Sequence, residues 1–152
     1  MDLYSKGQGA TEYLVLLAVV LMIALVSIAL LGFFPGLAGD AKETQADSYW
    51  KSARPFGILD SMSTGKDIIL IVQNNDPDMR TITQINLAGA TLNGSYILNA
   101  GEKRSLNVSN VTSSACSVGN RFEYVPNITF STVELAGLKQ LGTKPVMGKC
   151  TG

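Results

Sequence analysis

The sequence predicts an α+β protein, in which a long, hydrophobic N-terminal helix precedes a head built as an antiparallel β-sandwich or barrel-like sheet. Two observations predict this fold class. Residues 14–34 form an apolar run whose only non-apolar members are Ser27 and Gly32, and short β-branched runs separated by Gly, Asn and Pro follow residue 55. The 152 residues leave room for one helix and one domain of about 90–100 residues.

The apolar run has the length of a membrane-spanning helix. About 20 residues at about 1.5 Å each cross the hydrocarbon layer, whereas a secretory signal peptide has an apolar stretch of only about 7–15 residues. Residues 36–39, Gly-Leu-Ala-Gly, could pass as a weak signal-peptidase site. A cut in front of the helix, after Gly7, would instead keep the apolar run in the mature chain.

Glu12 places a carboxylate near the start of this run. An ionised group costs about 2.5–3.5 kcal/mol at the centre of a membrane and less near the interface. Membrane anchoring alone does not need such a group, whereas pairing with a neighbouring subunit would use it. The alternative is a carboxylate that reaches the membrane interface and needs no partner.

Residues 6–14, Lys-Gly-Gln-Gly-Ala-Thr-Glu-Tyr-Leu, resemble the class III signal sequence of archaeal type IV pilins. The resemblance implies that residues 1–7 are a leader peptide, which a prepilin peptidase removes by cutting between Gly7 and Gln8. Glu12 then becomes the fifth residue of the mature chain. Weaker similarity to methanogen-type pilins extends over residues 49–56 and 144–150.

The resemblance implies a structural subunit of an extracellular pilus used for adhesion to surfaces or cells. Residues 8–55 would span the cytoplasmic membrane in the precursor and, after transfer by the pilus assembly platform, form the core of a homopolymeric helical filament. Glu12 would pair with the freed α-amine of a neighbouring Gln8. The contacts between helices are expected to come from Leu14, Leu17, Leu21, Leu25 and Ile28.

Two alternatives share the apolar helix. The chain could stay uncleaved as a monomeric, membrane-anchored surface protein whose head binds a ligand, or it could be an archaellin, the subunit of a motility filament. The first alternative leaves Glu12 and the Gly7–Gln8 junction as coincidences. The second conflicts with the short head, because archaellin heads are longer.

Between the apolar run and the head, the helix either bends at Pro35 and continues or breaks and restarts at Asp40. Ala46, Tyr49, Trp50 and Ala53 recur at helical spacings and predict an apolar stripe that docks the helix against the head. Pro55 is expected to end the helix, because the residue before a proline is pushed out of helical geometry.

The head, residues 56–152, is expected to consist of short antiparallel strands. Alternation such as Leu106-Asn107-Val108 predicts strands with one buried face. The predicted strands are residues 67–73, 81–88, 91–98, 105–108, 122–125, 128–133 and 144–149.

Cys116 and Cys150 are the only cysteines. An even number of cysteines in a chain with export features favours a disulfide between them over two unrelated buried thiols. Such a bridge would hold the C-terminal segment, which otherwise frays most easily.

Four Asn-x-Ser/Thr sequons begin at Asn93, Asn107, Asn110 and Asn127. Each is a weak signal alone, but four in one exported domain predict N-glycosylation at two or more of them. Asn127 is the weakest candidate, because its neighbours are predicted to form a strand.

Composition argues against catalysis. Histidine is absent, which removes the commonest general base and excludes Ser-His-Asp and Cys-His nucleophiles. No zinc-type ligand set or phosphate-binding glycine loop occurs, so we expect a non-enzyme without metal or cofactor. The 12 basic and 12 acidic residues balance, and no basic patch points to nucleic acid.

Overall fold

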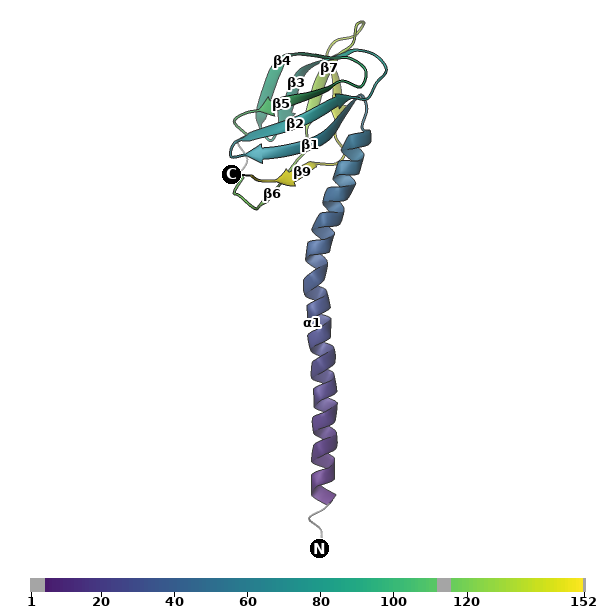
Figure 1. The fold of residues 1–152 in the computed structure, drawn as a ribbon, viewed down its shortest axis with the longest axis vertical. Helices are drawn as coiled ribbons and strands as arrows, with labels where there is room; N and C mark the ends of the chain where they lie inside the picture. The colour runs from purple at the N-terminus through teal and green to yellow at the C-terminus, as the bar shows by residue number, and fades with distance from the viewer. Residues whose placement is uncertain (1–4, 112–115, 152) are drawn as a thin grey trace. The chain divides into compact units, whose positions relative to one another are not determined.

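The computed structural model describes residues 5–111 and 116–151, except for the side chains of residues 5–8 and 32–37. The described part of the chain contains one long helix and nine strands, and the predicted α+β class is confirmed (Figure 1). The elements are α1 (Ser5–Ser52), β1 (Phe56–Thr64), β2 (Asp67–Asn74), β3 (Arg80–Leu87), β4 (Ala90–Leu98), β5 (Lys103–Val108), β6 (Arg121–Tyr124), β7 (Asn127–Ser131), β8 (Leu138–Leu141) and β9 (Val146–Lys149).

The chain divides into two compact units, Met1–Ala41 and Lys42–Gly152. The division falls within α1, so the second unit contains the last turns of the helix together with all nine described strands. The backbone of α1 is helical throughout Ser5–Ser52, which favours the continuing helix over a restart at Asp40. The helix ends just before Arg54-Pro55, as the proline predicts.

The strands of the second unit form a sandwich of two antiparallel sheets with a small third sheet beside it (Figure 1). One sheet has the order β1-β2-β5, the second has the order β4-β3-β7-β8, and β6 pairs with β9. Register shifts mark bulges in β1, in β3 and in β4, which bend the strands and increase their twist.

The core lies between the two larger sheets and follows the predicted alternation. Leu106 and Val108 are buried on either side of exposed Asn107, and β2 alternates in the same way along its whole length. The largest fully buried aliphatic side chains come from both sheets and are Ile68, Leu70, Val72, Val108, Ile82, Ile85, Leu87, Leu98 and Ile128. Burial of this apolar surface is the main force that holds the unit together.

The last turns of α1 pack against the strands through the predicted stripe. Ala46 and Trp50 are buried, and Tyr49 and Ala53 pack partly buried against the same core. The Trp50 indole N–H donates to the Lys144 carbonyl oxygen at 3.0 Å. The Nδ2 group of Asn75 donates to the Lys51 and Ala53 carbonyl oxygens, which satisfies acceptors that the helix end leaves free.

Gln140 joins β8 of one sheet to β1 of the other. Its Nε2 donates to the Phe56 carbonyl oxygen at 2.8 Å, and its Oε1 accepts the Phe56 backbone N–H at 3.0 Å. Phe56 is fully buried, and only 8% of the Gln140 surface is exposed. The amide therefore replaces the water that both backbone groups lost on folding.

We expect Gln140→Met to lower the free energy of unfolding by about 1–3 kcal/mol, because it keeps the side-chain volume and leaves the buried Phe56 groups without partners. Gln73→Met is the matched control, since Gln73 donates to the Gly101 carbonyl oxygen at an exposed site where water can replace it. Thermal unfolding followed by circular dichroism measures both variants. Equal stability of the two variants would contradict this role for Gln140.

Candidate functional site: the apolar segment of the N-terminal helix

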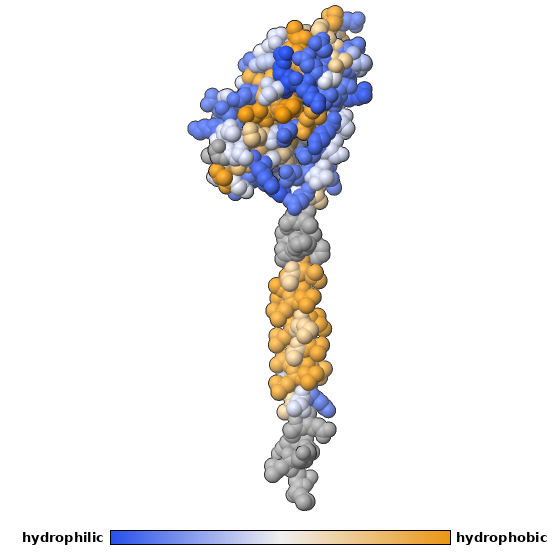
Figure 2. Space-filling model, in the orientation of Figure 1, coloured by the Kyte–Doolittle hydropathy of each residue, from blue (hydrophilic) through white to orange (hydrophobic). Residues whose placement is uncertain are grey.

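The residues from Gly9 to Leu31 form a helix that is long and apolar enough to cross a membrane. We call these 23 residues the apolar segment. None of it is buried inside the described structure, and Figure 2 shows it as a nearly continuous hydrophobic surface. A helix of this kind fits membrane association or a signal sequence.

The apolar side chains surround the segment on all sides. The five residues expected to form helix contacts share one face at heptad-like spacings, and they are exposed from 43% at Leu17 to 67% at Leu25. Leu16, Val20 and Ile23 lie on other faces and are equally exposed. Because a helix that is apolar all round is stable only when it is surrounded, the segment requires lipid or other protein on every side.

Ser27 is the polar side chain within residues 14–31, and its hydroxyl is satisfied by the helix itself. The Ser27 hydroxyl donates to the Ile23 carbonyl oxygen, one turn earlier, at 2.7 Å. In a medium without water, a polar group without a partner costs several kcal/mol, and this bond avoids that cost. Ser27 is therefore compatible with complete burial of the segment.

Glu12 is exposed and stands at the N-terminal end of the segment. At about 100° per residue, it lies on the face opposite the one shared by Leu14, Leu21 and Leu25. Its carboxylate borders a shallow hollow lined by Thr11, Val15 and Leu16. A partner for Glu12 would therefore approach a different face from a helix that packs on the leucines, as happens when several neighbours surround one helix.

The predicted processing site, Gly7 and Gln8, lies in the first turns of α1, where the backbone is helical. The predicted cysteine pair is joined: Cys116 and Cys150 form a disulfide with their Cα atoms 5.4 Å apart. Hydrogen bonds from the Cys150 N–H to the Asn120 carbonyl oxygen and from the Gly119 N–H to the Cys150 carbonyl oxygen flank the bridge.

The four sequon asparagines lie at different places in the sheets. Asn93 lies in β4 and Asn107 in β5, Asn110 follows β5 with a positive φ of 62°, and all three are exposed. Asn127 begins β7 between β3 and β8 and is only partly exposed. Its Oδ1 atom is buried and has no hydrogen-bond partner among the described residues.

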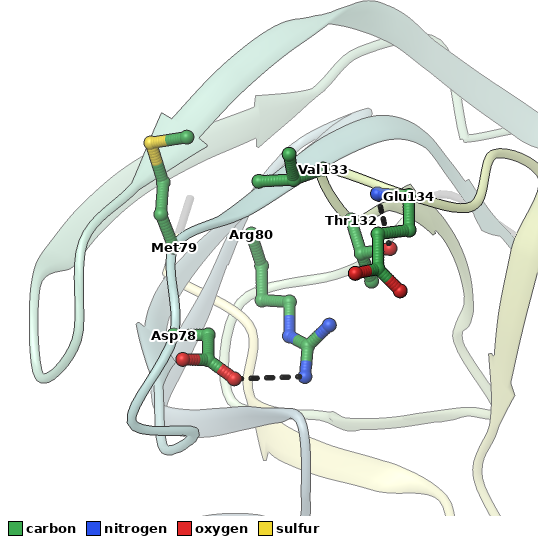
Figure 3. Close-up of a pocket in the computed structure, with 6 residues that line it drawn as sticks. All are labelled: Asp78, Met79, Arg80, Thr132, Val133 and Glu134. Atoms are coloured by element: carbon green, nitrogen blue, oxygen red, sulfur yellow. Dashed lines mark hydrogen bonds and ion pairs between the residues drawn. The ribbon is translucent and has the colours of Figure 1, made fainter.

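A hollow of the head with a volume of about 390 Å³ is lined by Asp78, Met79, Arg80, Thr132, Val133 and Glu134 (Figure 3). The Arg80 guanidinium is engaged there: one nitrogen lies 2.9 Å from Asp76 and 4.0 Å from Asp78. The Thr132 hydroxyl oxygen accepts the Glu134 N–H. These contacts hold the chain around Arg80 and around Thr132 in place, and Asp76 is engaged in its ion pair with Arg80.

Within the described residues, no three His, Cys, Asp or Glu side chains converge on a metal site.

Two ion pairs at the start of the second unit cannot be predicted from any pattern in the sequence. Lys42 pairs with Glu123 at 2.6 Å, and Glu43 pairs with Arg121 at 3.1 Å. Adjacent residues of α1 thus meet residues two apart on β6, where alternate side chains share one face. Adjacent opposite charges such as Lys42 and Glu43 occur on many exposed helices. Only the packing of this part of α1 beside β6 identifies their partners.

No protein-family model matches this chain, and no curated protein matches it either.

Proposed function

We propose that this protein is a structural subunit of an extracellular archaeal type IV pilus that serves adhesion to surfaces or cells. In this proposal, the chain is cut between Gly7 and Gln8 by a prepilin peptidase, leaves the cytoplasmic membrane through the assembly platform and polymerises through the apolar segment. The observation that carries the proposal is a fully exposed, all-round apolar helix with a carboxylate at its start.

The apolar segment could supply the cohesion of a filament. Burying about 1,000 Å² of apolar surface per subunit contributes about 25 kcal/mol before the costs of ordering are subtracted. The same surface suits lipid before assembly and neighbouring helices afterwards, because both exclude water. Ser27 needs no partner outside its own helix in either setting.

The second unit fits a subunit exposed outside the cell. It has its own core, and its disulfide is of a kind that persists in oxidising surroundings. A chain whose formal net charge is zero repels its copies little, which favours close packing of heads.

The anchored monomer and the archaellin remain the alternatives. An anchored monomer would keep the apolar segment in lipid and would have no use for Glu12. An archaellin would share the helix and the cleavage but would assemble into a motility filament. If filament assembly depends on Glu12, the anchored monomer is excluded and the two filament subunits, pilin and archaellin, remain.

Glu12→Ala tests the pairing with a neighbouring Gln8 amine. Removing one partner of a buried ion pair costs about 3–5 kcal/mol, so the yield of sheared surface filaments should fall at least about tenfold while the protein still reaches the membrane. Glu12→Asp keeps the charge and should retain part of the yield. Normal filament yield from Glu12→Ala would refute the pairing and remove the main argument for polymerisation.

A further inference from the structure

The β-sandwich of the second unit has one side that is closed by contacts between its sheets. On that side, Gln140 of β8 bonds to the Phe56 backbone of β1. The far end of β1 is covered as well, because Ser63 forms a bridge with Cys150 and accepts the Thr151 N–H at 2.9 Å. The backbone groups of Phe56 and Ser63, near the two ends of β1, are thus partnered by neighbouring parts of the same unit.

The opposite side of the sandwich is open. It is formed by β4 and β5, which are the edge strands of the two sheets and contact one another (Figure 1). Each pairs with one neighbour only among the described strands, β4 with β3 and β5 with β2. An edge strand presents unpaired N–H and C=O groups and is a template for pairing with another chain.

The turn between β4 and β5 holds the open side in place. The Asn99 backbone N–H and Nδ2 group both donate to Glu102 Oε2 at 2.9 Å, and this hydrogen bonding lowers the pKa of the Glu102 carboxyl. The Glu102 N–H in turn donates to the Asn99 carbonyl oxygen. The two edges are therefore presented together by a well-bonded turn.

Three of the four sequons lie on this open side. Asn93 stands in β4, Asn107 stands in β5, and Asn110 follows β5 two residues after its end. Gln84 donates to Asn93 Oδ1 at 3.0 Å, which orients the Asn93 amide on the outer face of the sheet and leaves its Nδ2 out of that bond. Asn107 points away from the core, because its neighbours Leu106 and Val108 are buried.

The fourth sequon lies in a different environment. Asn127 pairs with Asn86 of β3 and Leu141 of β8, so its strand has a neighbour on both sides. Its side-chain oxygen is buried, whereas the three other asparagines are exposed. A sugar at Asn127 would have to emerge from between two paired strands.

We propose that Asn93, Asn107 and Asn110 are the N-glycosylation sites of this protein, that Asn127 stays unmodified, and that the glycans shield the open β4–β5 side from strand pairing with other copies. The donor is a lipid-linked oligosaccharide phosphate. The asparagine Nδ2 forms a bond to the anomeric carbon of the sugar, and the bond between that carbon and the phosphate oxygen breaks. The lipid phosphate leaves with the electron pair of that bond, and the proton lost by the amide passes to solvent.

This inference requires that the head is exported, and it does not require polymerisation. Bulky, hydrated sugars at three points along two edges leave no room for a further strand, as charges and prolines do in other proteins. A bulge lies in β4 itself, where Gly94 and Ser95 oppose the single residue Thr83 of β3, so it disturbs this edge next to Asn93 and leaves the rest of the β3–β4 pairing regular.

Peptide mass analysis tests which sites are occupied. After reduction, trypsin releases residues 81–103 with Asn93, residues 105–121 with Asn107 and Asn110, and residues 122–139 with Asn127. We expect glycan mass on the first two peptides of the full chain recovered from its native cells, with fragmentation locating both sites of the second, and an unmodified third peptide. A glycan on the third peptide, or bare first and second peptides, would overturn the assignment.

The shielding role has a separate test in detergent micelles, which cover the apolar segment. Ser95→Ala, Ser109→Ala and Thr112→Ala together remove three sequons and keep each asparagine, including Asn110 with its left-handed backbone. Sedimentation should show that this triple variant associates at a concentration at least about tenfold lower than the native glycoprotein, with slowed amide exchange in β4 and β5.

Thr129→Ala removes only the Asn127 sequon and is the matched control, for which no change is expected. A triple variant that sediments as the native protein does would overturn the shielding role. Occupied edge sites in a protein that forms no filaments would instead overturn the pilin proposal and leave this inference intact.

Discussion

Trp50→Ala is expected to lower the free energy of unfolding of the second unit by about 3–5 kcal/mol. Trp50 is 1% exposed and joins the last turns of α1 to the sandwich core, so its removal leaves a large cavity. The Lys144 carbonyl oxygen also loses its indole donor. Thermal unfolding of the full chain in detergent, followed by the β-sheet circular dichroism signal, measures the loss.

Gly142 provides an independent check on this contact. A Cβ atom built on Gly142 would clash with Trp50 Cζ2, so Gly142→Ala should destabilise the native protein. In the Trp50→Ala background, the indole is gone and the same substitution should cost much less, which a double-mutant cycle detects. Additive effects of the two substitutions, or a loss below about 1 kcal/mol for Trp50→Ala, would contradict the docking of the helix end on the sandwich.

Cys150→Ser is expected to lower the free energy of unfolding by about 3–4 kcal/mol. The disulfide spans a sequence separation of 34 residues, and the loop-entropy relation gives about this value for a bridge of that length. The Cys150 backbone also forms an isolated β-bridge with Ser63 of β1. The loss of stability should therefore extend to the β6–β9 sheet. Amide exchange in these two strands reports this local effect.

Three measurements check that the disulfide itself is responsible. Cys116→Ser should cost as much as Cys150→Ser, and the double substitution should cost no more than either one. A reducing agent should bring the native protein to the same stability. Titration of two free thiols in the native protein would contradict the bridge.

Much of the head was predictable because its strands have one buried face. The run from Ile68 to Val72 and the alternation at Leu106–Val108 mark β2 and β5 clearly, and seven of the nine strands match the predicted segments within a few residues. The stripe that contains Ala46 and Trp50 is buried as predicted, because its spacing matches the helical period.

The two strands that were missed, β1 and β8, lack this signal. β1 contains Asp60 and two serines after a bulge, and β8 is four residues long with Lys139 and Gln140 at its centre. Their pairing is decided by the sheets beside them. The bidentate bonds of Gln140 to Phe56 join residues 84 positions apart, a contact that local sequence patterns cannot specify.

For the candidate site, the sequence predicted the apolar segment and its carboxylate because composition alone determines both. The structure adds that the segment is exposed on every face and that Glu12 stands opposite the leucines. It also shows that three sequon asparagines are exposed, whereas the side-chain oxygen of Asn127 is buried. This difference follows from the order of the strands in the sheets, and the Asn-x-Ser/Thr triplets alone do not predict it.

The most direct test of the filament proposal is the N-terminal peptide of this protein in filaments sheared from its native cells. The proposal predicts a chain that begins at Gln8 and is enriched in the filament fraction, while Gly7→Val leaves an uncleaved chain in the membrane. A native chain that keeps Met1 and stays in the membrane fraction would contradict the proposal in favour of the anchored surface protein. A chain that begins near Asp40 would show that the apolar segment is a signal sequence.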